Sequence, residues 1–283
     1  MPETASNTLI ELGSSLLKDI CTFPKMEAEM LLANALKINR IDFYKKNFCV
    51  NKKQEKVFNQ SIELRSNGMP MAYILGKKEF WSVKLTVNKN VLIPRPESEG
   101  LVERALKNLP KKNVNYKILE LGTGSGAISI SLAKERPNSL ITATDISKKA
   151  LSLAKYNALE NNIQNIDFVI SDWFNNLEKM QFNSIVVNPP YIDQDDKSSY
   201  DEFILKYEPE IALFANNKGR ESIYSIIQKS QFFLEPGGSL IMEHGFDQSQ
   251  FCQNMMQNFN LVNIVSTKDY NGYTRITEGF LKV

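Results

Sequence analysis

The chain has few of the residues from which metal centres and disulfide frameworks are built. It contains one histidine, His244, and three scattered cysteines, Cys21, Cys49 and Cys252. This spacing matches neither a disulfide framework nor a set of zinc ligands, so we expect no bound metal and a reducing compartment. The sequence also lacks an apolar run of membrane-spanning length, and residues 1–13 lack the basic start and apolar core of a signal peptide. We therefore expect a cytoplasmic protein that does not bind a membrane.

A strong excess of charge is missing as well. The 283 residues carry a formal net charge of +2, with 10 basic and 8 acidic residues up to Leu75 and 24 of each from Gly76 onwards. The near-neutral second half argues against a broad phosphate-binding surface, so no stable nucleic-acid partner is expected. With 42% hydrophobic residues the chain can bury a sizeable core, and its length favours about two domains.

A strand, a glycine-rich turn and a helix follow one another early in the second half. The apolar run of residues 116–121 is typical of a buried strand, and residues 127–136 have the pattern of a helix. Between them lies the glycine turn, Gly122-Thr123-Gly124-Ser125-Gly126. Glycines let the backbone approach a ligand closely, and the first N–H groups of a helix are free to bind it. The turn alone suits a nicotinamide dinucleotide and S-adenosylmethionine equally well.

Polar and aromatic residues end the next two strands. Asp145 closes the strand 140–145, at the distance from the turn where a carboxylate meets ribose hydroxyls in both classes of ligand. A helix cap is the alternative role for a carboxylate there, and Ser147 competes for it. Trp173 follows the strand 168–170 and is a candidate to pack on an adenine ring.

The NPPY motif carries the most specific chemistry in the chain. It follows the apolar run 184–187 and consists of Asn188-Pro189-Pro190-Tyr191. An amide or amino nitrogen bonded to an sp² carbon is a poor nucleophile, so a site that alkylates it must hold its NH2 group by both hydrogens. The Asn188 side chain offers one carbonyl acceptor and the backbone of Pro189 offers another, while the proline rings fix the local φ angles. Tyr191 can stack on the planar group and favour the positive charge that develops there.

The motif also decides between the two classes of ligand. A hydride-transfer enzyme has no use for an acceptor clamp, so the combination favours S-adenosylmethionine as a methyl donor. We expect the donor to be bound by the glycine turn, Asp145, Trp173 and Asn188. We expect the clamp of Asn188, Pro189, Pro190 and Tyr191 to bind the nitrogen substrate, with Asn188, Pro189 and Tyr191 as the catalytic residues.

With these motifs the sequence resembles the HemK/PrmC family of protein glutamine methyltransferases. Beyond the glycine turn and the NPPY motif, the similarity includes Arg65, Pro70, residues 73–76 and the linker 91–99, where a threonine is more usual than Ser98. It continues through residues 208–213, the segment 243–245, Gln248, Asp269, Gly272 and Arg275. The NPPY motif is shared with methyltransferases that act on adenine and guanine, whereas the linker is more specific.

The resemblance implies a fold, a cofactor and a partner. The fold is α/β, a seven-stranded Rossmann-like class I methyltransferase domain dependent on S-adenosylmethionine. The substrate is the glutamine of a Gly-Gly-Gln loop in peptide chain release factors, and its methylation supports translation termination. A nucleic-acid amino methyltransferase is the alternative activity, and a non-catalytic S-adenosylmethionine-binding scaffold is a third possibility.

Hydrophobic patterns divide the chain into three parts. Residues 1–75 are expected to form a helical domain, with an apolar stripe at Leu9, Leu12, Leu16 and Ile20. The pattern alone would also suit a domain that only packs on the catalytic part, but the resemblance implies that it recognises the protein substrate. Residues 76–95 alternate in polarity, which predicts a β-hairpin linker with a turn at residues 88–90. In residues 96–283 strands near 117, 141, 168, 184 and 239 alternate with helices, which predicts a parallel sheet. Residues 262–265 and 276–281 are expected to form an antiparallel hairpin at its edge.

Two places depart from the family pattern. Residues 214–220 replace a glycine-rich stretch, so neither the conformation near Asn216 nor the role of Arg220 follows from the sequence. His244 stands where an aliphatic residue is expected, and we interpret it as structural because methyl transfer to an amide needs no histidine base.

Overall fold

The computed structural model describes residues 4–178, 180–199 and 202–283 of the chain. It divides into two compact units, one made of Met1–Gly76 with Glu202–Tyr207 and the other of Lys77–Asp201 with Glu208–Val283. The predicted domain limits at residues 75 and 95 stay predictions. The sequence did not indicate that Glu202–Tyr207, far along the chain, belongs to the first unit. Within the described ranges, no helix is long and apolar enough to cross a membrane.

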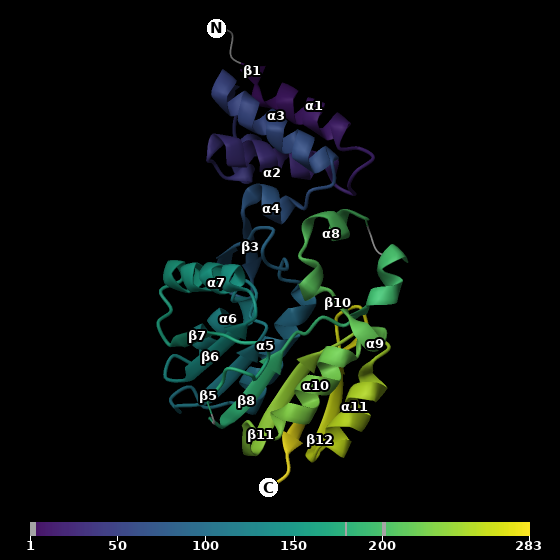
Figure 1. Cartoon of the computed structure of the whole chain (residues 1–283). Helices are drawn as coiled ribbons and strands as arrows, with labels where there is room; N and C mark the ends of the chain where they lie inside the picture. Colours follow the sequence, from purple (N-terminus) through teal and green to yellow (C-terminus); the bar gives the residue numbers. More distant parts are fainter. Residues whose placement is uncertain (1–3, 179, 200–201) are drawn as a thin grey trace. The chain divides into compact units, whose positions relative to one another are not determined.

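The first unit is mainly helical (Figure 1). It contains α1 (Ser6–Leu16), α2 (Pro24–Leu36), α3 (Lys52–Ser66), α4 (Met71–Leu75), α8 (Glu202–Tyr207) and a short strand pair, β1 (Thr4–Ala5) and β2 (Cys49–Val50). α3 starts where it does because the Asn51 side chain accepts hydrogen bonds from the N–H groups of Lys53 and Gln54. The Tyr207 hydroxyl donates to the Asn67 carbonyl at 3.0 Å, which joins α8 to this unit.

The predicted apolar stripe of α1 is wrong in part. Leu12 and Leu16 are 53% and 57% exposed, while Ile10 and Leu17 are buried with Leu9. The helix turns this face inward because Gly13 lies against α3. A Cβ atom on Gly13 would lie 2.8 Å from the Phe58 ring, so the glycine allows a close approach that a count of apolar residues does not reveal.

The second unit opens with the predicted β-hairpin, but its turn lies elsewhere. β3 (Lys77–Phe80) pairs antiparallel with β4 (Val83–Thr86), so the turn is at Trp81 and Ser82 rather than at residues 88–90. Trp81 has a φ of 52°, the left-handed conformation that a tight two-residue turn requires. The Asn88 turn instead redirects the chain through Val91, whose N–H donates to the Asn88 carbonyl at 3.1 Å.

A seven-stranded sheet forms the centre of the second unit and confirms the predicted fold. Its strand order is β12-β13-β11-β8-β5-β6-β7. The strands are β5 (Lys117–Leu121), β6 (Leu140–Asp145), β7 (Ile166–Ile170), β8 (Phe182–Val187), β11 (Leu234–Glu243), β12 (Leu261–Lys268) and β13 (Thr274–Leu281). The first five in chain order are parallel, and β13 runs antiparallel between β11 and β12. The predicted terminal hairpin is therefore present, with β12 at the edge.

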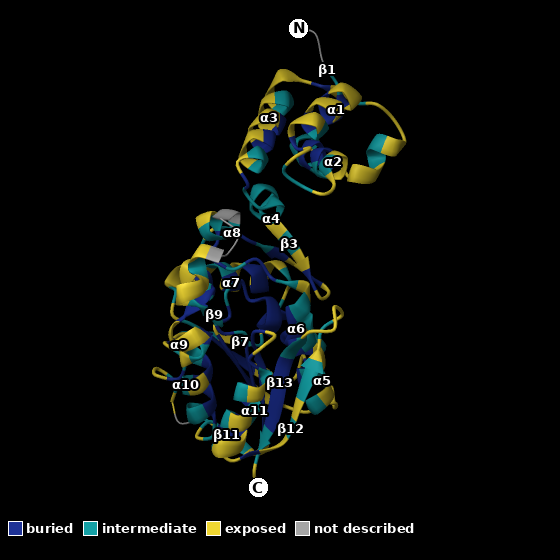
Figure 2. Cartoon of the chain, turned by 90° about the vertical axis from the view of Figure 1, so that its right-hand side faces the viewer, coloured by how far each residue is buried: buried dark blue, intermediate teal, exposed yellow. Residues whose placement is uncertain are grey.

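Helices cover both faces of the sheet (Figures 1 and 2). They are α5 (Glu99–Asn108), α6 (Ala127–Glu135), α7 (Lys148–Glu160), α10 (Glu221–Ser230) and α11 (Ser249–Asn258). Leu119, Ile185 and Leu240 pack with Ile226 of α10 and Met256 of α11 in one buried cluster. Their strand neighbours, such as Ile118 and Val186, are also fully buried and point to the opposite face, so the strands read as continuous apolar runs.

The register of the parallel strands brings their carboxyl ends to one level. Val187 of β8 pairs with Leu121 of β5 and with Met242 of β11. Leu121 in turn pairs with Thr144 of β6. The residues that follow these four are Gly122, Asp145, Asn188 and Glu243. The sheet therefore presents the glycine turn, two carboxylates and the NPPY motif along a single edge.

Candidate active site

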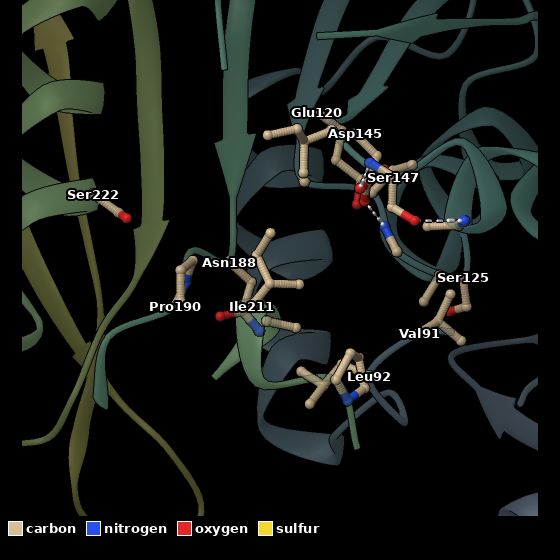
Figure 3. A pocket seen from close by; sticks show the side chains of 18 of the residues that line it. Val91, Leu92, Glu120, Ser125, Asp145, Ser147, Asn188, Pro190, Ile211 and Ser222 are labelled. Atoms are coloured by element: carbon tan, nitrogen blue, oxygen red, sulfur yellow. Dashed lines mark hydrogen bonds between the residues drawn. The ribbon is translucent and has the colours of Figure 1, made fainter. Parts of the chain in front are cut away.

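A cavity of about 550 Å³ lies at this edge of the sheet (Figure 3). Eight of the predicted site residues line it, namely Gly122, Thr123, Gly124, Ser125, Asp145, Trp173, Asn188 and Pro190. Asp145 and Glu120 lie on one side of it and Asn188 and Pro190 on another, as Figure 3 shows. Residues from both predicted sets, for the donor and for the nitrogen substrate, thus line one cavity. Gly126, Pro189 and Tyr191 do not line the cavity.

The glycine turn adopts backbone conformations that favour glycine. Gly122, Gly124 and Gly126 have φ values of 70°, 56° and 84°. A Cβ on Gly124 would meet no atom within 4 Å, so this peptide faces open space in the cavity. A Cβ on Gly126 would instead lie 2.9 Å from Ile130 of α6 and 3.2 Å from Ala154 of α7, so that glycine allows α6 and α7 to pack closely, and it is not among the residues that line the cavity. The turn therefore combines a ligand-facing part with a packing part.

Asp145 organises the glycine turn. Its carboxylate accepts hydrogen bonds from the N–H of Gly124 at 2.9 Å and the N–H of Ser147 at 2.8 Å. Ser147 itself caps α7 by accepting from the Ala150 N–H, so the helix-cap role falls to the serine. Burial raises the pKa of Asp145, and the backbone donors oppose that rise. A carboxylate has about four lone-pair positions, so Asp145 keeps capacity to accept from ribose hydroxyls.

Glu120 holds the same turn from inside the sheet. Its Oε2 accepts from the Thr123 hydroxyl at 2.6 Å and from the Ser129 N–H at 2.9 Å. The side chain is almost fully buried yet lines the cavity. Burial raises its pKa to about 7, although the hydrogen bonds from Thr123 and Ser129 lower it. The role of Glu120 could not be predicted from the sequence, because nothing in a strand pattern marks one inward-facing carboxylate as functional.

The NPPY motif is fixed by side chains from three other segments. Asn188 donates from Nδ2 to the Ser98 hydroxyl at 3.0 Å, and Tyr191 donates from its hydroxyl to Glu243 at 3.3 Å. The Tyr191 carbonyl accepts from Gln248 Nε2 at 2.9 Å. Hydrogen bonds therefore fix the side chains of Asn188 and Tyr191 as well as the backbone at Tyr191, and the proline pair restricts the backbone between them.

The loop near Asn216 supports the same motif. Asn217, Lys218 and Gly219 have φ values of 55°, 57° and 70°, three consecutive left-handed residues. A Cβ on Gly219 would lie 1.9 Å from the Tyr191 carbonyl oxygen, so only glycine fits against that carbonyl. Gln248 Nε2 also donates to the Lys218 carbonyl at 3.1 Å, which joins the loop to the motif. Arg220 lies with its guanidinium 4.9 Å from the centre of the Phe251 ring.

The linker segment 91–99 forms a wall of the cavity that was not predicted from the sequence. Val91, Leu92, Pro94, Arg95 and Ser98 line the cavity. The wall is held in place by the buried Glu208, which accepts from the Ile93 N–H at 3.1 Å and from the Arg95 guanidinium. Both segments carry residues typical of the family, but only the structure shows that the Glu208 carboxylate joins them.

His244 is structural in its contacts. Its Nδ1 bonds to the Gly245 carbonyl and its Nε2 to the Thr277 hydroxyl, both at 2.8 Å. Burial lowers its pKa, which favours the neutral ring. Among the described residues no group of three or more His, Cys, Asp or Glu side chains is arranged to hold a metal ion.

The sheet order, the glycine turn and the cavity at the strand ends define a class I S-adenosylmethionine-dependent methyltransferase fold. Solved structures share it. A methyltransferase from Pyrococcus furiosus aligns with a TM-score of 0.52 at 18% identity, covering 71% of this chain and 90% of that one. The 16S rRNA N2 G1207 methyltransferase of T. thermophilus, solved with AdoMet and guanosine, aligns with a TM-score of 0.52 at 14% identity. The alignment covers 73% of this chain and 50% of that one.

Sequence comparisons give the family. Residues 103–208 match the methyltransferase small domain and residues 8–76 the PrmC N-terminal domain. The release factor glutamine methyltransferase of Coxiella burnetii is 40% identical over 93% of this chain and 94% of its own length. The release factor glutamine methyltransferase of Buchnera aphidicola subsp. Schizaphis graminum is 42% identical over 92% of this chain and 93% of its own length. The chain belongs to the release factor glutamine methyltransferase family, as its motifs predicted.

The buried carboxyl of Glu120 should make stability depend on pH. Because its pKa is raised from 4.5 to about 7, the folded protein binds more protons at this site than the unfolded chain between these values. Its contribution to stability therefore falls as pH rises through that window. Glu120→Gln lacks this loss. Between about pH 4.5 and about pH 7, its free energy of unfolding should therefore rise by up to about 3 kcal/mol relative to that of the wild type. Urea denaturation of both proteins at about pH 5 and about pH 8 measures this, and a pH-independent difference would contradict it.

Proposed function

We propose that the protein transfers the methyl group of S-adenosylmethionine to the side-chain amide nitrogen of the glutamine in a Gly-Gly-Gln loop of peptide chain release factors. This reaction would support translation termination in the cytoplasm. One observation carries the proposal: Asn188 of the NPPY motif and the glycine turn line the same cavity. The names of the curated relatives support the choice of a release factor glutamine as substrate.

The residues around the cavity fit S-adenosylmethionine. Gly124 leaves room for a ligand against the backbone, Asp145 keeps acceptor capacity for ribose hydroxyls, and Trp173 lies beside Gly122 as a candidate to pack on adenine. A Cβ on Gly122 would lie 3.6 Å from the Trp173 ring, so the tryptophan bounds the space next to the turn. When bound, S-adenosylmethionine supplies an electrophilic methyl group on a sulfonium.

The NPPY motif prepares the amide nitrogen for attack. Asn188 Oδ1 and the Pro189 carbonyl each accept one hydrogen of the glutamine NH2, which turns the nitrogen toward the methyl group. S-adenosylmethionine held by the glycine turn, Asp145 and Trp173 would supply the methyl group. The nitrogen would bond to the methyl carbon as the bond from carbon to sulfur breaks, and would then lose one proton to water. The two carbonyls face the positive charge that develops on nitrogen, so orientation and electrostatics give the acceleration. No residue is assigned as a general base.

Mass spectrometry of an unmodified release factor, incubated with this protein and S-adenosylmethionine, tests the proposal. We expect the mass of one methyl group to be added and mapped to the glutamine of the Gly-Gly-Gln loop. A release factor whose loop glutamine is replaced by glutamate is the matched control and should gain nothing. Labelled methyl found in RNA or DNA but absent from the release factor would refute the proposed substrate in favour of a nucleic-acid amino methyltransferase.

Replacement of Asn188 should lower the rate of methyl transfer but change the binding of S-adenosylmethionine little. Asn188→Ala removes one of the two acceptors that orient the glutamine nitrogen, so we expect the rate of transfer to fall roughly a hundredfold or more. Binding of S-adenosylmethionine, measured by calorimetry, should stay within a few-fold of wild type, because the glycine turn, Asp145 and Trp173 remain as expected contacts of the donor. Transfer at the wild-type rate would show that Asn188 does not clamp the amide.

Tyr191 allows its ring and its hydroxyl to be tested separately. Tyr191→Phe removes only the hydroxyl, whose bond to Glu243 is long at 3.3 Å, so we expect a loss of about threefold. Tyr191→Ala also removes the ring that is proposed to stack on the amide, and should lose a further tenfold or more. Single-turnover rates with saturating donor compare the two. Equal losses in both variants would mean that the ring does not stack on the substrate.

A further inference from the structure

A chain of hydrogen bonds leads from the NPPY motif to a buried carboxylate. Asn188 Nδ2 donates to Ser98 Oγ at 3.0 Å, and Ser98 Oγ donates to Glu243 Oε2 at 2.7 Å. Glu243 ends β11 and is 2% exposed, and Ser98 ends the short helix Pro96–Ser98 in the linker and is 4% exposed. Ser98 lines the cavity, whereas Glu243 is not among the residues that line it. The carboxylate is therefore connected to the cavity through its hydrogen-bond partners.

The direction of these bonds follows from the number of protons available. A serine hydroxyl has one proton, and an ionised carboxylate can only accept. The Ser98 proton must therefore point at Glu243, which leaves the Ser98 oxygen as an acceptor toward Asn188. The NH2 group of the Asn188 amide then has to face Ser98, and Oδ1 has to face away from it.

The direction of these hydrogen bonds matters because the oxygen and the NH2 group of an asparagine amide are nearly equal in size. Rotation by half a turn exchanges oxygen and NH2 with little change in shape, so only hydrogen bonds select one orientation. With Oδ1 away from Ser98, the side chain offers an acceptor to a substrate NH2. In the reversed orientation it would offer a donor instead, and two NH2 groups would face each other without an acceptor between them.

We propose that Ser98 and Glu243 are positioning residues that select the orientation of the Asn188 amide in which it accepts a hydrogen bond from the substrate nitrogen. The inference rests on the proposed function, because it assigns the residues that make the same amide clamp competent. Glu243 has a second arm, since Oε1 accepts from the Tyr191 hydroxyl at 3.3 Å. One carboxylate thus links the linker, the NPPY motif and β11.

The surroundings of Glu243 define when it is ionised. Burial raises its pKa to about 6, while hydrogen bonds from Ser98 and Tyr191 and the positive charge of Arg275 on β13 lower it. Glu97 in the linker adds negative charge that raises it. The carboxylate is thus ionised at neutral pH and protonated below about pH 6. Once protonated it can donate to Ser98, which then donates to Asn188 Oδ1 and favours the reversed amide.

Three serine variants test the inference by single-turnover kinetics on a release factor. Ser98→Ala deletes the relay and should lower the rate of transfer by about tenfold to a hundredfold, because a misplaced clamp group costs that much. Ser98→Thr keeps the hydroxyl and should recover most of that loss. Ser230→Ala removes another buried hydroxyl, which donates to the Ile227 carbonyl in α10, and controls for stability.

The outcomes separate positioning from packing. A Ser98→Ala protein with the wild-type rate overturns the inference, and so does an equal loss in Ser98→Ala and Ser98→Thr. Binding of S-adenosylmethionine should stay within about threefold in all three variants, since the relay does not change the glycine turn. A loss of donor binding that matches the loss of rate would place Ser98 in the cofactor site and also overturn the inference.

The pH profile tests the carboxylate. We expect the wild-type rate to fall as pH drops through about 6 and this acid limb to be absent from Glu243→Gln, which is slow at every pH. Glu120 and Asp145 also line the cavity, so the comparison with Glu243→Gln is needed to assign the limb. A limb that persists unchanged in Glu243→Gln contradicts the role given to this carboxylate.

A spectroscopic measurement separates this inference from the proposed substrate. The side-chain amide signal of Asn188 in a 15N-labelled protein, assigned by its absence from Asn188→Asp, should shift with a midpoint near pH 6. The shift should disappear in Ser98→Ala. This needs no substrate, so a titrating signal combined with no methylation of a release factor would refute the proposed function alone, and a signal that does not titrate would refute the relay alone.

Discussion

The pairing register of four parallel strands is the constraint on which the site depends. Val187 of β8 lies level with Leu121 of β5 and Met242 of β11, and Leu121 lies level with Thr144 of β6. A shift of one residue in any pair would turn its side chains to the other face and displace the group that follows the strand. Continuous apolar burial on both faces fixes this register. The chemistry at the edge is thus positioned by the packing of side chains that never contact a ligand.

Buried carboxylates then organise what the strands bring together. Glu120 and Asp145 hold the glycine turn, Glu208 holds the linker, and Glu243 holds Ser98 and Tyr191. Each is desolvated, which is costly for a charged group unless hydrogen bonds compensate. Here the compensating donors are backbone N–H groups, hydroxyls and the Arg95 guanidinium, and several of them, such as Thr123, Gly124 and Ile93, lie in loops. The carboxylates therefore give loops the rigidity that helices and strands provide elsewhere.

Much of this arrangement could be predicted from the sequence, because it follows from local patterns. Apolar runs placed the strands, and the glycine turn and the NPPY motif located the cavity. The face of α1 was missed because it depends on the absence of a side chain at Gly13, which a hydrophobic pattern does not count. The turn of the hairpin was misplaced because Trp81 adopts a left-handed conformation that favours other residues. Ser98 and Glu243 lie 145 positions apart, so no local pattern joins them.

A crystal structure with S-adenosylhomocysteine and a peptide containing the Gly-Gly-Gln loop would test the central claim most directly. The account predicts that the glutamine amide nitrogen lies within hydrogen-bond distance of Asn188 Oδ1 and of the Pro189 carbonyl, facing the sulfur atom. It also predicts that Asn188 Nδ2 remains on Ser98. A glutamine nitrogen bound by other groups, or an Asn188 amide that has left Ser98, would contradict it.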